Sequence, residues 1–114
     1  MEFMLLIKAE YKSLYELSPK EMQLCLEKNG RFIGQLVAEG KMEGGGALDR
    51  SGILVERSYN AFVESPLDDQ QEELMSYLRI KAKDLTEAVE IAKSDPGFDQ
   101  PGWKIEVRPV LTNS

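Results

Sequence analysis

The segment FMLLIKAEYKSLYELSPKEMQLCLEKNGRFIGQLVAEGK, residues 3–41, contains three successive patterns that together decide the fold. It begins with the apolar residues 3–8, continues with the more polar residues 9–16 and ends in a long stretch of helical periodicity. A short apolar run followed by polar residues is typical of a strand that leads into a loop. We therefore expect a strand, a loop and then a helix.

Capping residues mark both ends of this helix. Ser18 fits the N-cap and Glu21 its capping-box partner, while Pro19 fits the first turn because the N–H that it lacks would have no partner there. Gly40 can adopt the left-handed conformation that commonly follows a helix. Between these caps, apolar residues recur at helical spacing and are expected to form the buried stripe: Met22, Cys25, Leu26, Ile33, Leu36 and Val37.

The rest of the chain has the pattern of strands around a second helix. The segments with strand character are residues 41–48, 52–58, 60–63 and 74–80, and the Tyr59-Asn60 pair marks a turn. Asp84 and Glu87 mark the start of a second helix, and residues 103–111 form a final strand. This order predicts an α+β fold: a ferredoxin-like antiparallel sheet with two helices on one face and an extra β-hairpin.

Composition limits the domain count and the partners. The chain has 114 residues, the size of one domain, so we expect residues 1–114 to fold as a single unit. Its 14 Lys and Arg residues against 20 Asp and Glu residues give a net charge of −6, which disfavours nucleic acid as a partner. We expect no membrane span and no secretory signal, because no apolar run approaches the roughly 20 residues that a span needs. The single Cys25 cannot form an internal disulfide, which fits a reducing cytoplasm.

The chain contains no histidine, which excludes whole classes of mechanism. Ser-His-Asp and Cys-His catalysis and histidine-ligated metal sites all need this residue, so any general acid or base must be a carboxylate, Tyr, Lys or Cys. Five of the ten residues 64–73 are acidic, but they lack the ligand pattern of a calcium loop and are better explained as a solvated loop. The three consecutive glycines at residues 44–46 are not followed by the lysine of a phosphate-binding loop. Glycines at such a position more commonly mark a bulge in a strand. We expect neither a metal nor a cofactor.

Several segments over nearly the whole chain resemble the YCII-related proteins, also called the DGPF family. In order, these segments are Phe3-Met4-Leu5-Leu6-Ile7, Leu17-Ser18-Pro19, Glu39-Gly40-Lys41, Gly44-Gly45, Lys83-Asp84-Leu85-Thr86-Glu87-Ala88 and Glu106-Val107-Arg108-Pro109. The resemblance implies a dimeric α+β barrel built from ferredoxin-like subunits. The naming motif, Asp-Gly-Pro-Phe, stands here as Glu64-Ser65-Pro66-Leu67, so Glu64 takes the place of the aspartate. A His and Asp pair suspected in some relatives has no counterpart, because this chain lacks histidine.

The face of the expected sheet that the helices leave uncovered is partly apolar. Met4, Leu6 and Met75 belong to this face, and a sheet needs cover on both sides. We therefore expect a homodimer formed by two apposed sheets, with a partly polar cavity between or beside them.

Four residues are candidates for lining this cavity: Glu64, Tyr77, Glu106 and Arg108. Glu106 and Arg108 lie two residues apart on the final strand, so they point to the same face and could present an acid and a clamp for an anion. The same two residues could instead form an ion pair within the sheet or between subunits. Tyr77 could donate a hydrogen bond to a ligand or be a core tyrosine.

Two functions are open at this stage, and no catalytic residue can be named. The first is a dimeric protein that binds a small anionic molecule, with lyase-like or isomerase-like chemistry by a carboxylate of raised pKa as a further option. The second is a non-enzymatic dimer that regulates or scaffolds through a protein partner.

Overall fold

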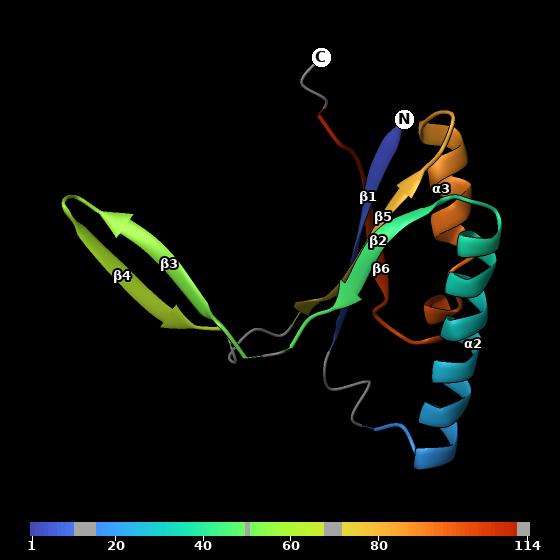
Figure 1. Ribbon diagram of the computed structural model, residues 1–114. Helices are drawn as coiled ribbons and strands as arrows, with labels where there is room; N and C mark the ends of the chain where they lie inside the picture. The colour runs from blue at the N-terminus through green and yellow to red at the C-terminus, as the bar shows by residue number, and fades with distance from the viewer. Residues whose placement is uncertain (11–15, 50, 68–71, 112–114) are drawn as a thin grey trace.

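The computed structural model describes residues 1–10, 16–49, 51–67 and 72–111. Within these residues the chain is an α+β protein with two α-helices, a short 3-10 helix and six strands. The elements are β1 (Glu2–Glu10), α2 (Pro19–Ala38), β2 (Met42–Ala47), β3 (Ile53–Ser58), β4 (Ala61–Pro66), β5 (Glu72–Lys81), α3 (Leu85–Lys93), η1 (Pro96–Asp99) and β6 (Lys104–Pro109). Figure 1 shows both helices on one side of the larger sheet and the β3–β4 hairpin extending away from it.

The strands form two antiparallel sheets. One has four strands in the order β2-β5-β1-β6, and the other consists of β3 and β4. Strand β1 is central in the larger sheet, so that Leu6 lies opposite Tyr77 of β5 on one side and Glu106 of β6 on the other. The register of β2 against β5 shifts between Met42 and Gly44, which confirms the irregularity expected in the glycine segment.

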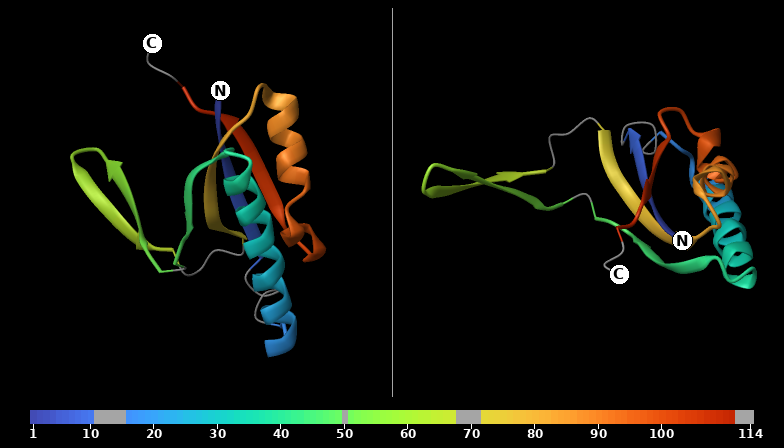
Figure 2. Two further views of the ribbon diagram at one scale, coloured as in Figure 1. Left: turned by 45° about the vertical axis from the view of Figure 1, so that its right-hand side comes forward. Right: turned by 90° about the horizontal axis from the view of Figure 1, so that it is seen from above.

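The core lies between the larger sheet and the helices. Buried and half-buried residues alternate along β1, because successive side chains of a strand point to opposite faces. The buried apolar side chains of this core are Phe3, Leu5, Ile7, Phe32, Leu36, Leu78, Ile80, Ala82, Ala88, Ile91 and Ala92. Neither of the two described α-helices packs against the other side of the sheet (Figure 2).

The caps confirm the predicted helix boundaries. Ser18 Oγ accepts a hydrogen bond from Glu21 N at 3.1 Å, and the Glu21 carboxylate accepts one from Ser18 N at 3.2 Å. Gly40 has a φ of 70°, the left-handed conformation expected after the helix. The Asp84 carboxylate caps α3 by accepting from Glu87 N at 2.9 Å.

The predicted buried stripe of α2 is only partly right. Of the predicted residues, Leu36 is buried and Ile33 packs partly buried against the core. Met22, Leu26 and Val37 are exposed, whereas Phe32, which the pattern did not select, is buried. At 100° per residue, Leu26 and Val37 lie about 120° to 140° around the helix from Phe32, too far to face the sheet. Cys25, expected to belong to the buried stripe, is only half-buried, and its sulfur accepts a hydrogen bond from Gln100 Nε2 at 3.3 Å.

The hairpin of β3 and β4, residues 53–66, is called the arm below. It confirms the two predicted strands and the turn at Tyr59, whose φ is 55°. Every residue of β3 is exposed, and in β4 only Ser65 is half-buried. The arm therefore contributes almost nothing to the core of the single chain.

Asp95 is the one buried charged residue among the described residues, and it connects the start of η1 to Trp103, the residue before β6. Its carboxylate accepts hydrogen bonds from Gly97 N at 2.8 Å and from Trp103 Nε1 at 3.4 Å. Burial raises the pKa of Asp95, and the two hydrogen bonds only partly offset this. The folded chain therefore binds this proton more tightly than the unfolded chain does.

This linkage predicts a pH effect on stability. Because the folded pKa of Asp95 is raised, the contribution of this group to the free energy of unfolding should fall as pH rises from the ordinary range of Asp through the raised value. Urea unfolding of the wild type and of Asp95→Asn between about pH 3 and pH 7 measures this, since the variant should lack that part of the decline. Asp84→Asn, at an exposed N-cap, controls for the change of residue type. Identical pH profiles for the wild type and Asp95→Asn would contradict the prediction.

Candidate functional site

Three of the four predicted site residues share one face of the larger sheet. We call the side opposite the helices the open face. Tyr77 and Glu106 both lie opposite Leu6, and Arg108 lies opposite Met4 in the next cross-strand row. Since directly opposed residues of antiparallel strands share a face, these three side chains belong to the open face. The backbones of Tyr77 and Glu106 are two strand spacings apart, about 10 Å.

The Glu106 carboxylate lies between two cations. Lys8 Nζ is 2.5 Å from its Oε2, and Arg108 Nε is 3.7 Å from its Oε1. The hydrogen bond from Lys8, the charge of Lys8 and, to a smaller extent, the charge of Arg108 lower the pKa of Glu106. A lowered pKa makes a carboxylate a weaker base. The base of raised pKa that the sequence led us to expect is therefore not Glu106.

Of Lys8, Arg79 and Arg108 on the open face, Arg108 has the most capacity for another anion. Lys8 is already in close contact with Glu106, and Arg79 donates to Glu2 Oε2 from Nε at 3.0 Å and from Nη2 at 2.5 Å. Among the described residues, the one ion pair of Arg108 is its 3.7 Å contact with Glu106, and its side chain is 68% exposed. A guanidinium has five donors and suits bidentate recognition of carboxylate or phosphate. These features make Arg108 the strongest candidate for an anion clamp.

Tyr77 lies on the open face rather than in the core, so the alternative of a core tyrosine is wrong. The residue is 36% exposed. Its ring passes beside Gly46 of β2, where a Cβ would lie 3.6 Å from the phenol oxygen. Within the described residues no hydrogen bond reaches this hydroxyl, which is therefore available to a ligand.

Glu64 is separated from the other three residues in the single chain. It lies on β4 of the arm, opposite Val55, and it is exposed. Figures 1 and 2 show the arm projecting from the side of the larger sheet that the helices do not cover. The single chain thus brings Tyr77, Glu106 and Arg108 to one face and leaves Glu64 on a separate element.

Lys8 is a member of this cluster that sequence reasoning did not select. Its alternation with Met4 and Leu6 along the first strand placed it on the open face. Its closeness to Glu106 depends on the pairing of β1 with β6, which the alternation alone does not specify.

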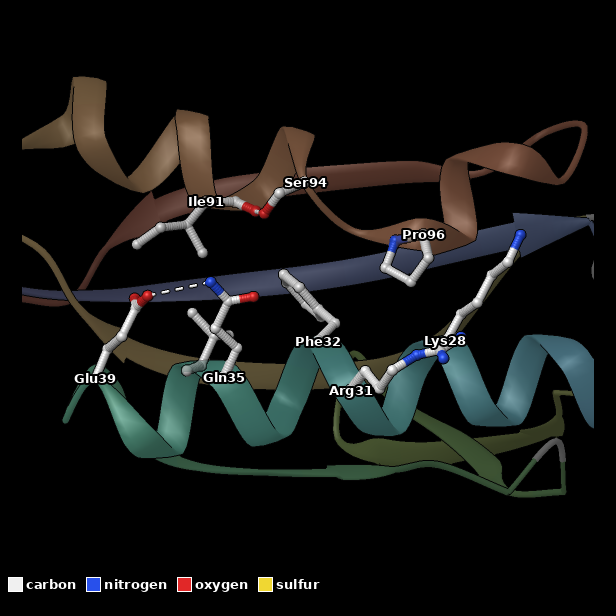
Figure 3. A pocket seen from close by; sticks show the side chains of 9 residues that line it. Lys28, Arg31, Phe32, Gln35, Glu39, Ile91, Ser94 and Pro96 are labelled. Carbon is white, nitrogen blue, oxygen red and sulfur yellow. Dashed lines mark hydrogen bonds between the residues drawn. The ribbon is translucent and has the colours of Figure 1, made fainter.

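A groove of about 340 Å³ lies on the opposite side of the molecule, between α2 and α3 (Figure 3). Its floor is formed by the core residues Phe32, Leu36 and Ile91, and Lys28 and Arg31 lie at one end. At the other end Gln35 donates a hydrogen bond to Glu39 at 3.2 Å. None of the four predicted residues lines this groove, and its floor belongs to the helix-packing core, so we do not assign the predicted site to it.

No group of three or more His, Cys, Asp or Glu side chains suited to a metal occurs in the described residues. Residues 68–71 of the acidic segment lie outside the described residues, so the loop expected there is not tested. No described helix is both long enough and apolar enough to cross a membrane.

Comparison of the chain with models of known protein families and with curated proteins gives no match. The case for a function therefore depends on the chemistry of the open face.

Proposed function

We propose that the chain is a dimeric small-molecule-binding protein that holds an anionic ligand on the open face, beside its dimer interface. The observation that carries the proposal is Arg108, an exposed guanidinium on an otherwise paired cluster of charges. A dimer of ferredoxin-like subunits is also the architecture that membership of the YCII-related family would imply. The strand order β2-β5-β1-β6 with both helices on one face supports the ferredoxin-like plan of that family. The cytoplasm, expected from the lone Cys25, is the compartment we propose.

The open face suits a ligand with one anionic end and one polar end. Arg108 would bind a carboxylate or phosphate in bidentate geometry, and the free hydroxyl of Tyr77 would donate to a carbonyl or hydroxyl group. Met4 and Leu6 lie between these two polar groups and supply an apolar floor. A small metabolite acid of about 10 Å would span the distance between the flanking strands.

A purely structural or scaffolding dimer is the second candidate. The observation that favours it is the Glu106 carboxylate, which Lys8 and Arg108 already engage and whose pKa is lowered. An ion pair of this kind can serve an interface without any ligand. The low basicity of Glu106 also favours binding over proton abstraction, so we propose no catalytic step.

A thermal-shift screen against small metabolite anions tests the proposed function. A ligand at one hundred times its dissociation constant should stabilise the wild type by about 2.7 kcal/mol. Arg108→Ala should abolish this stabilisation, because the clamp for the anion is lost. Arg31→Ala is the matched control: it removes an exposed arginine from the groove between α2 and α3, on the other side of the molecule.

The pattern of the two variants decides between the surfaces. Loss in Arg108→Ala with retention in Arg31→Ala supports binding on the open face. The reverse pattern would place the ligand in the helix groove and contradict the proposal. Absence of any stabilising anion would favour the scaffolding dimer.

A further inference from the structure

The arm is an unsupported hairpin with an apolar surface. Its exposed apolar side chains are Ile53, Leu54, Val55, Phe62 and Val63. An isolated two-stranded hairpin is only marginally stable in water and usually needs a third strand or another packing surface. Exposed apolar patches of this kind mark interaction sites. The arm therefore needs a packing surface, and the described part of the single chain does not provide one.

One face of the arm combines this apolar surface with a carboxylate. Ile53 pairs with Pro66, Val55 with Glu64, and Arg57 with Phe62, so these six residues share a face. The Arg57 guanidinium lies over the Phe62 ring, 5.5 Å from its centroid. We call this side the Glu64 face. Any partner that covers Ile53 and Val55 also covers Glu64, and a buried carboxylate needs a cation.

The open face offers the matching surface. Met4, Leu6 and Tyr77 form its apolar centre. The described cations of this face outnumber the three carboxylates that pair with them, Glu2, Glu43 and Glu106; these cations are Lys8, Arg79, Lys81, Lys104 and Arg108. Lys8 and Arg79 have carboxylate oxygens at 2.5 Å. Among the described contacts of Lys8, Arg79 and Arg108, that of Arg108 is the longest, at 3.7 Å, and Arg108 is therefore the natural counter-ion for Glu64.

The accessible surface area of the single chain is larger than that of a compact monomer of the same mass. The accessible area is 8181 Å², whereas a compact monomer of 12.9 kDa exposes about 6,300 Å². The radius of gyration is 16.2 Å against about 13 Å for a compact domain of this length. The excess of about 1,900 Å² per chain amounts to about 3,800 Å² in a dimer, within the range of obligate interfaces.

We propose that the arm of one copy lies with its Glu64 face across the open face of a second copy, and that the second copy returns the contact. Each open face then contains Glu64 of the other chain beside Tyr77, Glu106 and Arg108. Because the Arg108 guanidinium has five N–H donors, one edge can engage Glu64 while another edge holds the anionic ligand, and the ligand site is complete only in the dimer. The inference rests on the proposed function for its ligand, but the arm exchange has its own support in the exposed arm and the excess surface. A two-fold symmetric exchange satisfies both arms and both open faces at once.

The first test measures the oligomeric state by analytical ultracentrifugation at matched concentrations. The wild type should be a dimer, and Val55→Lys should shift it to a monomer because a lysine enters the centre of the Glu64 face. Val37→Lys on α2 is the matched control, because both valines are 59% exposed in the single chain. Val37→Lys should remain a dimer. A monomeric wild type, or a Val55→Lys variant that dimerises like Val37→Lys, would overturn the proposal.

The second test asks whether Glu64 meets Arg108 between chains. Glu64→Arg and Arg108→Glu should each weaken the homodimer at least tenfold, because each places like charges together at both sites. The two variants are then mixed, each with a different affinity tag. In the heterodimer the two substituted positions face each other with opposite charges, and the unchanged Glu64 faces the unchanged Arg108. The heterodimer should therefore form with nearly wild-type affinity. An arm folded onto its own open face would give no such rescue in the mixture, and that outcome would refute exchange between chains.

The two tests also separate this inference from the proposed function. A dimer that depends on Val55 and shows heterodimer rescue but binds no anion would support arm exchange and contradict the ligand. An anion that depends on Arg108 in a chain whose arm variants still dimerise would support the ligand and refute the exchange.

Discussion

Replacing Phe3 by alanine should lower the free energy of unfolding by about 3 to 5 kcal/mol. Phe3 is completely buried, on the central strand of the larger sheet, opposite Ile80 of β5 on one side and Pro109 of β6 on the other. Removal of its ring leaves a cavity that the close-packed core can only partly fill, so lost transfer free energy and cavity formation add. Urea unfolding monitored by circular dichroism measures the change.

Phe98→Ala is the matched control for Phe3→Ala. Phe98 belongs to η1 and is 46% exposed, so its loss should destabilise the chain by less than half as much. Both variants are compared with the wild type at one protein concentration, because dimerisation would make the apparent stability depend on concentration. A Phe3→Ala variant within about 1 kcal/mol of the wild type would contradict the position of β1 at the centre of the core.

Features that depend on neighbours in sequence were predictable. The capping box of Ser18 and Glu21 and the left-handed Gly40 involve residues within one helical turn, so their residue types suffice to locate both ends of α2. The alternation along β1 likewise follows from strand geometry alone. For the same reason the hairpin was expected at its turn, because Tyr59-Asn60 separates two segments of strand character.

Features that depend on how one element packs against another could not be predicted from the sequence. Leu26 and Val37 belong to the apolar pattern of α2 but are exposed, because the face that meets the sheet is set by Phe32 and Leu36. Apolar spacing over a 20-residue helix allows several overlapping stripes, and only packing selects one of them. The exposure of the arm is a tertiary property of the same kind, since the strand pattern of β3 and β4 gives no information on what covers them.

The same distinction between local and long-range features applies to the candidate site. Alternation sufficed to place Glu106 and Arg108 on one face, but the lowered pKa of Glu106 arises from Lys8, which is about 100 residues away in sequence and adjacent only through strand pairing. The four-residue site predicted from sequence also assumed that Glu64 would join the others. In the single chain it does not, and the arm exchange proposed above is the arrangement that unites all four.

Exchange would also protect the arm from aggregation. A hairpin with free strand edges and apolar side chains can pair with other chains without limit. A reciprocal contact between two copies closes the assembly, because each arm and each open face is used once. Variants that block the exchange, such as Val55→Lys, are therefore expected to expose the open face as well as to release the arm.

Gly45→Ala should destabilise the chain by about 1 to 3 kcal/mol and disturb the site at the same time. A Cβ at residue 45 would lie 2.6 Å from the carbonyl oxygen of Tyr77 and 2.9 Å from Leu78 Cδ2. The first of these is a backbone atom, so the clash cannot be relieved by rotation of a side chain, and β2 must move relative to β5. Because Tyr77 belongs to the strand that is pushed, anion binding on the open face should weaken along with stability.

The neighbouring glycines provide matched controls within the same strand. A Cβ at Gly44 meets no atom within 4 Å, and one at Gly46 makes ordinary contacts with the Tyr77 ring from 3.6 Å outward. Gly44→Ala should therefore change the free energy of unfolding by no more than about 0.5 kcal/mol, as a surface substitution does, and Gly46→Ala should be tolerated. Equal losses in Gly44→Ala and Gly45→Ala would mean that strand β2 rejects any side chain, and not that it approaches β5 closely at one residue. A loss of stability confined to Gly45→Ala is the result expected from the register of β2 against β5. The same register places Gly46 opposite Tyr77, and a glycine at this position leaves the phenol ring exposed on the open face.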